Sequence, residues 1–210
     1  MHANPEISVL LPFHSAAETL ADCLDSILRQ AFPCFEVLAI DDGSTDESAD
    51  IVRRYAQADR RIRLLQPGRI GLVTALNLGI EQARSPIIAR MDADDLMHPD
   101  RLQAKYAYLN DHPEIALVAS QVELFPADLI HAGYQEYVRW QNLCLEPAGI
   151  AANIYVESPF AHPSVMFRHA IVERLGGYRA GITRMRSFEC VSVIRCNVAE
   201  QSSALVAPSA

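Results

Sequence analysis

Three aspartates within four residues form the part of this chain best suited to chemistry. Asp92, Asp94 and Asp95 follow directly on an apolar run, with Ala93 between the first two. Carboxylates a few ångströms apart raise each other's pKa, so crowding them is unfavourable unless a cation compensates their charge. Oxygen ligands select hard ions, and Mg²⁺ or Mn²⁺ keep open positions for phosphate oxygens. The cluster therefore predicts a divalent-cation site; the alternative is a helix N-terminal cap ahead of Pro99.

A second acidic pair, Asp41 and Asp42, follows another apolar run and leads into Gly43 and Ser44. An Asp–Gly turn is common in loops, and Ser44 with Glu47 matches a helix capping box. Taken alone, these features favour a structural role for the pair. A functional role becomes the better interpretation because both acidic clusters end strands of the same predicted sheet.

Strands and helices must alternate along the first half of the chain to position these clusters. The apolar runs have the pattern of strands covered on both faces, and the stretches between them carry an apolar helical stripe. A capping box of Ser15 and Glu18 is predicted to start the first helix. The predicted strands are Ile7–Leu11, Glu36–Ile40, Ile62–Leu65 and Ile87–Met91, and the predicted helices are Leu20–Leu28, Asp46–Ala58 and Gly71–Ala83. This order predicts an α/β fold with a doubly wound, mostly parallel sheet that binds ligands outside the carboxyl ends of its strands.

The second half of the chain has a weaker periodicity. Its predicted helices are Arg101–Leu109, Glu136–Leu143 and His169–Leu175, and its predicted strands are Ile115–Leu124 and Ser164–Phe167.

Composition limits the kind of protein. The chain has 210 residues, 50% apolar and 21% charged, which is the balance of a globular domain. Its net charge of −8 gives no field that attracts nucleic acid. The five cysteines form no C-x-x-C pair, so neither a zinc knuckle nor a disulfide framework is indicated. We expect no signal peptide, because the N-terminal segment has no basic region and Pro12 interrupts its apolar run. No stretch approaches the roughly 18 apolar residues of a membrane span. We expect a cytoplasmic protein with no transmembrane segment, with peripheral membrane association as an alternative.

One local basic run stands against the acidic background. It comprises Arg53, Arg54, Arg60, Arg61 and Arg63. The simpler interpretation is the solvated face of one helix and its exit, rather than a binding patch.

Five segments in order resemble the motifs of family 2 glycosyltransferases, which have the GT-A fold. They read ISVLLPFHSAAETLADCLDSILRQ, FEVLAIDDGSTDES, GLVTALNLGI, IIARMDADDLMHPDRL and SPFAHPSVMFR…GGYR. The likeness runs from about Ile7 to Arg179, and five ordered motifs are far more specific than any single one. It implies transfer of a sugar from a nucleotide-diphosphate donor, UDP-type favoured, to a glycan or lipid-linked acceptor, as in bacterial surface-glycan enzymes. It also implies a catalytic domain over residues 1–180, with a nucleotide-binding half (1–124) and an acceptor-side half (125–180).

The resemblance assigns the donor site position by position. Asp92-Ala93-Asp94 matches the D-x-D motif, whose carboxylates hold Mn²⁺ or Mg²⁺ and touch the ribose, with Asp95 beside them as a third metal residue. Through the metal, Asp94 acts on the departing diphosphate and counts as catalytic. The implied nucleotide-sugar-binding residues are Pro12, Phe13, His14, Glu18, Asp41, Asp42, Gly71, Asn77, Asp92 and Ala93.

Four positions of the likeness carry a specific role, an alternative or a departure. Asp42 matches the carboxylate that reads a uracil-type base edge. For Asn77, which matches a segment beside the nucleotide, a buried structural hydrogen bond is an equal alternative. His162 resembles a residue near the donor phosphate and the acceptor, and a structural role is again the alternative. His14 stands where asparagine is common in the family.

The C-terminal segment departs from the family pattern. After GGYR the family carries a Glu-Asp pair, then an aromatic residue and an apolar helix, and one carboxylate of the pair is the general base of an inverting displacement. Aligning Phe188 with that aromatic residue places Arg186 and Ser187 at the pair, and neither is a base at neutral pH. Glu189 is the remaining nearby carboxylate. Residues 181–210 therefore read as an atypical tail, expected to be disordered.

Two other functions compete with an active transferase. One is a catalytically impaired remnant that binds the nucleotide sugar without the general base. The other is a phosphotransferase with a nucleophile at Asp41 or Asp42; it would need a D-x-D-x-T-like run after the first strand, where this chain has Pro12, Phe13 and His14.

Overall fold

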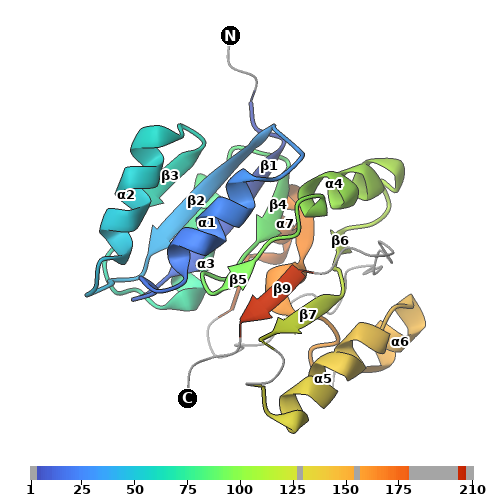
Figure 1. Ribbon diagram of the computed structural model, residues 1–210. Coiled ribbons are helices and arrows are strands. Elements are labelled where there is room, and N and C mark those ends of the chain that lie inside the picture. The colour runs from blue at the N-terminus through green and yellow to red at the C-terminus, as the bar shows by residue number, and fades with distance from the viewer. Residues whose placement is uncertain (1–3, 127–129, 154–156, 180–202, 207–210) are drawn as a thin grey trace.

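The computed structural model describes residues 4–126, 130–153, 157–179 and 203–206. Helices and strands alternate through the first half as predicted (Figure 1). The elements of this half are β1 (Ile7–Phe13), α1 (Leu20–Leu28), β2 (Phe35–Asp41), α2 (Ser48–Ala58), β3 (Ile62–Leu65), α3 (Leu72–Gln82) and β4 (Ile87–Arg90). Those that follow are β5 (Asp95–Leu96), α4 (Arg101–Asp111), β6 (Leu117–Val118), β7 (Val122–Phe125), α5 (Ala132–Leu143), α6 (Pro147–Asn153), the 3-10 helix η2 (His162–Ser164), β8 (Met166–Arg168), α7 (His169–Leu175) and β9 (Ser203–Val206).

The main sheet has six strands in the order β3-β2-β1-β4-β8-β6. The first four are parallel, whereas β8 runs antiparallel to both β4 and β6. The prediction of a doubly wound, mostly parallel α/β sheet is confirmed. The strand order steps outward in both directions from β1, which places the topological switch, and hence the expected ligand site, at the carboxyl ends of β1 and its neighbours.

Helices cover both faces of this sheet because the side chains of each central strand alternate between two cores. Val9 and Leu11 of β1 lie in one core with the apolar faces of α1, α2 and α4, whereas Leu10 lies in the other core with those of α3 and α7. All seven residues of β1 and of β2 are buried. A strand buried on both faces reads as a continuous apolar run, and this explains why the sequence pattern located these strands well.

A smaller sheet has the order β5-β9-β7, with β9 antiparallel to β5 and parallel to β7. It lies next to the carboxyl-end edge of the main sheet (Figure 1). β9 belongs to the C-terminal tail, whose assignment as a separate segment stays a prediction, as do the boundaries of the two halves.

The predicted strand Ile115–Leu124 is wrong in one respect, because two strands in two different sheets take its place. β6 pairs with β8 in the main sheet, whereas β7 belongs to the small sheet. The side-chain amide of Asn142 accepts a hydrogen bond from the Val122 N–H at 3.0 Å and donates one to its carbonyl at 2.7 Å. A distant side chain therefore replaces a strand partner at the start of β7, which a local pattern cannot reveal.

Ser164–Phe167 is likewise not a strand throughout. Its first residue ends η2, where the Ser164 N–H donates to the Ala161 carbonyl at 3.0 Å, and β8 begins at Met166.

Neither predicted capping box forms. Helix α1 begins at Leu20 and α2 at Ser48, and no side-chain cap hydrogen bond is present at either start. Ser15, with a φ of 50°, and Ser44 instead join the two loops: the Ser15 N–H donates to Ser44 Oγ at 3.0 Å, and the Thr45 N–H donates to Ser15 Oγ at 3.3 Å. The serines were correctly identified as polar partners of backbone N–H groups, but their partners lie about 30 residues away.

Candidate active site

The candidate site lies where β1, β2 and β4 end. Phe13 is in register with Asp41 across β1 and β2, and Leu10 of β1 is in register with Arg90, the last residue of β4. The acidic clusters therefore lie at the carboxyl ends of β2 and β4, the two strands that flank β1, at the same edge of the sheet. This edge is the lower one in Figure 1, opposite the N-terminus.

The loops after β1 and β2 are fastened to each other. The Ala16 N–H donates to Ser48 Oγ at 2.8 Å and the Ala17 N–H donates to Asp46 Oδ2 at 3.0 Å. The hydrogen bond from the Ser48 hydroxyl contributes most to lowering the pKa of Asp46, so this carboxylate stays ionised. His14 Nδ1 lies 3.0 Å from the Asp42 carbonyl oxygen. Together these bonds fix two loops that would otherwise lose conformational entropy on binding a ligand.

Asp42 holds a third loop against the first two. Its Oδ1 accepts hydrogen bonds from the Ile70 and Gly71 N–H groups, both at 2.7 Å, and its Oδ2 lies 3.9 Å from Arg69 Nε. Gly71 has a φ of 82°, which favours glycine, and it is the residue before α3. The structure thus brings Asp42 and Gly71 together through a contact inside the protein.

Asp41 is saturated with hydrogen bonds. Burial raises its pKa, but the hydrogen bonds from Ser44 and Gln66 outweigh burial and leave the pKa lowered. The Ser44 N–H reaches Oδ1 at 2.8 Å and Gln66 Nε2 reaches Oδ2 at 3.1 Å. This carboxylate is ionised and occupied, which makes it a loop anchor and a poor nucleophile.

The second acidic cluster is different, because its carboxylates have few donors. Asp92 forms an ion pair with buried Arg90, and Asp94 is exposed. Asp95 is 3% exposed, and its Oδ2 has no hydrogen-bond partner. Burial, with added repulsion from Asp92 and Asp94, raises the pKa of Asp95 to about 8. Although Asp94 is exposed, neighbouring protein atoms displace part of the water around its carboxylate, and this desolvation together with the charge of Asp92 raises its pKa as well.

Helix α1 fixes the backbone of this cluster. The Thr19 hydroxyl donates to the Ala93 carbonyl at 2.9 Å, and the Cys23 thiol donates to the Asp92 carbonyl at 3.3 Å. Burial, and then Asp95, raises the pKa of Cys23 well above its usual range, so it remains a thiol. A buried structural thiol is the role that its position on the helix core face indicates.

Three buried cations stand behind the acidic cluster, and the sequence analysis missed all of them. Arg90 and Arg101 are each 2% exposed and Lys105 is 1% exposed. Arg101 donates to the Arg90 carbonyl at 2.7 Å and to the Pro163 carbonyl at 2.5 Å, and Lys105 donates to the Ser164 carbonyl. Burial lowers the pKa of Arg101 to about 10, which leaves it charged at neutral pH. The available signal was Arg90 immediately before the acidic run and two basic residues four apart on the next helix.

His162 and Tyr178 form a wall beside Arg90. His162 Nε2 lies 3.2 Å from the Tyr178 hydroxyl, and the two rings meet edge to face. Burial, helped by the charge of Arg90, lowers the pKa of His162 well below its usual range, and burial raises that of Tyr178 to about 12. At neutral pH this pair is therefore uncharged.

Asn77 makes structural hydrogen bonds, which was the alternative to its predicted contact with the nucleotide. Its amide donates to the Tyr178 carbonyl at 2.8 Å and accepts from the Tyr178 N–H at 2.7 Å. A Cβ at Gly177, whose φ is 75°, would come within 2.6 Å of Asn77 Oδ1. The asparagine thus ties α3 to the Gly-Gly-Tyr turn and holds Tyr178 against His162.

The remaining predicted residues, apart from Glu189, belong to β1 and to the loop that follows it. Pro12 and Phe13 are buried at the end of β1, and His14 and Glu18 are exposed in the loop that follows. Glu189, the predicted substitute for the general base, lies outside the described residues.

Comparison with known proteins decides the family. The model of the family "Glycosyl transferase family 2" matches residues 8–176, most of the chain. The chain belongs to glycosyl transferase family 2. It is 30% identical over 195 residues to EpsE of Bacillus subtilis, covering 92% of this chain and 66% of that protein. It is 30% identical over 175 residues to the amylovoran biosynthesis glycosyltransferase AmsE of Erwinia amylovora, covering 82% of this chain and 63% of that protein.

Solved structures show the same GT-A fold. TarS of S. aureus, in complex with UDP-GlcNAc, superposes with a TM-score of 0.76 at 17% identity, over 98% of this chain and 59% of that one. The mannosyltransferase PcManGT of Pyrobaculum calidifontis, in complex with GDP-Man and Mn²⁺, gives a TM-score of 0.73 at 23% identity, over 98% and 57%. This family 2 chain therefore spans about two thirds or less of the length of these relatives.

A divalent cation fits this site as a shared ligand of protein and substrate. No group of three or more His, Cys, Asp or Glu that could hold a metal ion occurs in the described part of the chain. Mg²⁺ usually takes one or two carboxylates and completes its shell with substrate phosphates and water. Asp92 and Asp94 are accessible enough to supply such ligands, and the buried Oδ2 of Asp95 has no hydrogen-bond partner of its own.

No helix among the described residues is long and apolar enough to cross a membrane.

Proposed function

We propose that this chain transfers a sugar from a nucleoside-diphosphate donor to a glycan or lipid-linked acceptor, with inversion at the anomeric carbon and with a divalent cation. The observation that carries the proposal is the pair of acidic clusters at the carboxyl ends of β2 and β4, on either side of β1. One cluster anchors the loops, and the other has few hydrogen-bond donors. The complexes of TarS with UDP-GlcNAc and of PcManGT with GDP-Man and Mn²⁺ support the donor class and the cation. The name of AmsE, an amylovoran biosynthesis glycosyltransferase, supports a glycan as the acceptor.

The nucleotide is assigned to the loops after β1 and β2. Pro12 and Phe13 would contact the base, and the carboxylate of Asp42 would accept a hydrogen bond from it while its other oxygen keeps the loop at Gly71 in place. The fastened loops support this assignment, because a site that is already ordered binds with a smaller entropic cost. A UDP-type donor remains the favoured one.

The diphosphate is assigned to the segment after β4. Asp92 and Asp94 would hold the cation, which when bound neutralises charge on the departing diphosphate. Arg90 would keep the Asp92 carboxylate oriented through their ion pair. The lowered pKa of His162 makes it an uncharged neighbour of the diphosphate, able to donate or accept a hydrogen bond according to its tautomer.

Calorimetry with UDP tests the donor site directly. We expect binding in the presence of Mn²⁺ or Mg²⁺ and much weaker binding after chelation. Equal affinity with and without the metal would refute the metal assignment, and no binding under either condition would refute the donor site itself.

A second candidate is a donor-binding protein that transfers sugar poorly. It is favoured by Arg186 and Ser187, which stand where the family has its acidic pair. General-base assistance contributes about 10²–10⁴-fold to a rate. We expect the chain to bind nucleotide, hydrolyse the donor slowly and transfer little; Glu189→Gln should remove a measurable residual activity if Glu189 is the base. Robust transfer that survives this change would refute both the assignment of Glu189 and the second candidate.

A further inference from the structure

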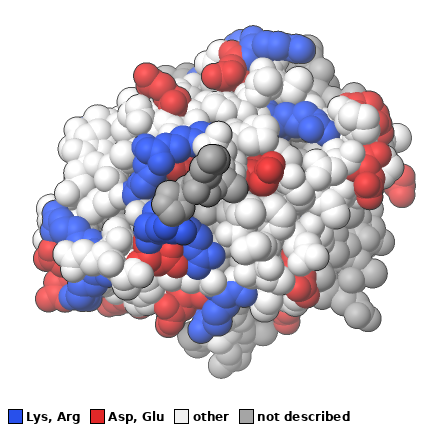
Figure 2. All heavy atoms as spheres, turned by 90° about the horizontal axis from the view of Figure 1, so that it is seen from above, with Lys and Arg blue, Asp and Glu red and all other residues white. Residues whose placement is uncertain are grey.

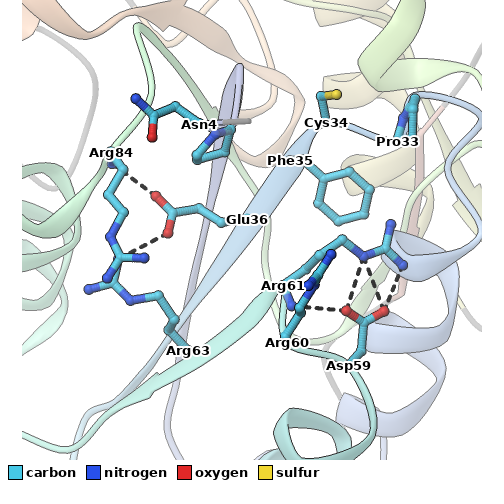
Figure 3. A pocket seen from close by; sticks show the side chains of 11 residues that line it. Asn4, Pro33, Cys34, Phe35, Glu36, Asp59, Arg60, Arg61, Arg63 and Arg84 are labelled. Carbon is cyan, nitrogen blue, oxygen red and sulfur yellow. Dashed lines mark hydrogen bonds and ion pairs between the residues drawn. The ribbon is translucent and has the colours of Figure 1, made fainter. Parts of the chain in front are cut away.

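A pocket of about 520 Å³ opens at the opposite edge of the main sheet, where the parallel strands begin (Figure 3). It is formed by the residues just before β1, β2, β3 and β4 and by the first residues of β2 and β3. The acidic clusters follow the carboxyl ends of these same strands. The pocket is therefore separated from the candidate active site by the length of the sheet.

The lining of this pocket is basic in an acidic protein. Four arginines and two carboxylates line it, which gives a net charge of +2 (4 − 2) in a chain whose total is −8. The arginines are Arg60, Arg61, Arg63 and Arg84, and the carboxylates are Glu36 and Asp59. Basic side chains gather on the face of the molecule seen from this end (Figure 2).

Two of the arginines are held in place and neutralised. Arg61 makes hydrogen bonds from Nε and Nη2 to the Asp59 carboxylate at 2.7–3.1 Å, and its guanidinium lies 4.4 Å from the centre of the Phe35 ring. Arg63 donates to Glu36 at 2.9 Å. These two ion pairs fix the positions of Arg61 and Arg63 in the lining, and they are drawn as dashed contacts in Figure 3.

Glu36 accepts hydrogen bonds from three segments that line or support the pocket. Its side chain is 6% exposed, and besides Arg63 it accepts hydrogen bonds from the Ser8 hydroxyl at 2.8 Å and the Arg84 N–H at 2.9 Å. These bonds link the starts of β1 and β2 to the backbone of Arg84, the fourth arginine of the pocket. The Arg84 side chain is thus anchored at its backbone, while the side chain itself is exposed.

The lining carries a net charge of +2, and Arg60 and Arg84 are the two of its arginines that are exposed. A guanidinium presents its donors in a planar fork that matches phosphate oxygens. The pocket volume lies in the range of small-ligand sites, about 300–1,000 Å³. We propose that this pocket binds a phosphate group, with Arg60 and Arg84 as its main ligands and the Arg61 and Arg63 pairs as its support. This site is additional to the donor site and does not depend on the proposed transferase activity.

The phosphate could belong to a soluble metabolite or to a phospholipid headgroup, and both present the same chemistry. The structure also divides the basic run that the sequence suggested was a solvated helix face. Arg53 and Arg54 lie on the exposed face of α2, whereas Arg60, Arg61 and Arg63 line the pocket. Only the second part of the run is therefore a candidate for phosphate binding.

Pyrophosphate in metal-free buffer is a suitable soluble probe, because chelation suppresses binding at the predicted cation site. We expect calorimetry to detect binding that the double variant Arg60→Ala/Arg84→Ala weakens about tenfold or more, since two charge-assisted contacts are removed. The matched control is Arg29→Ala/Arg54→Ala, which removes the same charge from exposed helix positions. Equal weakening in both double variants would overturn the site, because it would reveal a general charge effect.

Cys34 reports whether the probe is in the pocket. It lines the pocket and is exposed, whereas Cys23 and Cys144 are buried. We expect pyrophosphate to slow alkylation of Cys34, measured by mass spectrometry of its peptide, in the wild-type chain and in the control but not in Arg60→Ala/Arg84→Ala. Binding without any protection of Cys34 would overturn the location.

Vesicles distinguish the two sources of phosphate. Sedimentation with phosphatidylglycerol vesicles but not with phosphatidylcholine vesicles, abolished in Arg60→Ala/Arg84→Ala, would identify a headgroup site. Pyrophosphate binding without vesicle binding would identify a soluble ligand. If the chain binds neither pyrophosphate nor the vesicles, the proposal is overturned. UDP affinity should be unchanged in the double variant, so a failure of the donor site and a failure of this pocket give different results.

Discussion

The two acidic clusters look alike in the sequence but differ in their surroundings. Around Asp41 and Asp42, backbone N–H groups and the Gln66 side chain supply hydrogen bonds, and the pKa of Asp41 is lowered. Around Asp95 there is a carboxylate oxygen without a partner, and the pKa is raised to about 8. The first cluster is stabilised mainly by neutral hydrogen-bond donors of the protein. In the second cluster the buried arginines offset only part of the burial and repulsion of the carboxylates, so an added cation would stabilise it further.

This difference teaches what acidic residues at a strand end can do. Carboxylates that are fully hydrogen-bonded hold loops in place and bind a ligand only through an oxygen left over. Carboxylates that are crowded without donors favour a cation, because only a charge nearby offsets their repulsion and burial. The variants below test the two kinds of cluster separately.

The largest effect is expected from removing a buried cation of the second cluster. Arg101→Leu leaves the carbonyls of Arg90 and Pro163 without their donor and removes a counter-charge from Asp95. A hydrogen bond from a charged donor contributes about 1.5–3 kcal/mol, so the loss of these two buried ones should cost about 3–6 kcal/mol. Urea unfolding should show this decrease in the free energy of unfolding, whereas Arg54→Leu on the exposed face of α2 should change it by about 0.5 kcal/mol or less. A small effect at Arg101 would mean that the second cluster does not need the buried cations.

A smaller effect, on binding rather than folding, is expected at Asp94. Asp94→Ala removes an exposed carboxylate from the predicted cation site, so stability should hardly change. Even residues that only support a ligand contribute roughly 10–100-fold to metal affinity, and a direct ligand should contribute at least as much. Calorimetry should show that Mn²⁺ no longer strengthens UDP binding, with Asp111→Ala at the exposed end of α4 as the control. A metal effect that persists would return the second cluster to the role of a helix cap.

The contrast also explains how far the sequence could predict the molecule. β1, β2 and β4 were located well because each is a largely apolar run buried on both faces, whereas in β3 only Ile62 is buried. Ser15 and Ser44 were misassigned as helix caps because their partners lie in another loop. Arg101 and Lys105 were missed because charged residues four apart on a helix normally indicate a solvated face, and only the folded structure shows them buried against carbonyls of η2 and its neighbours.

The first cluster is expected to give a divided result. In Asp42→Asn the retained oxygen can still accept from Ile70 and Gly71, so the free energy of unfolding should fall by less than about 1 kcal/mol. The changed group no longer accepts from a nucleotide base, and UDP binding should weaken by about 1–3 kcal/mol. Asp50→Asn on exposed α2 is the matched control, measured by the same calorimetry and urea unfolding. Lower stability with unchanged UDP affinity would make Asp42 a loop anchor alone.

The smallest effect concerns the uncharged wall beside the second cluster, and it depends on pH. The pKa of His162 is lowered in the folded chain, by burial and by Arg90, whereas in the unfolded chain it is ordinary, about 6.5. Below that pH the His162 side chain binds a proton in the unfolded state but not in the folded state. The contribution of neutral His162 to the free energy of unfolding is therefore complete at neutral pH and is lost as the pH falls. His162→Gln removes this pH-dependent loss of stability. When the pH is lowered from 7.5 to 5.5, the free energy of unfolding of the variant should therefore rise by about 1 kcal/mol relative to that of the wild type. His112→Gln, at a side chain 44% exposed, is the control in the same urea titrations. An unchanged difference between the two pH values would mean that His162 takes up a proton in the folded chain, and Arg90 would then face a second cation where the structure has a neutral ring.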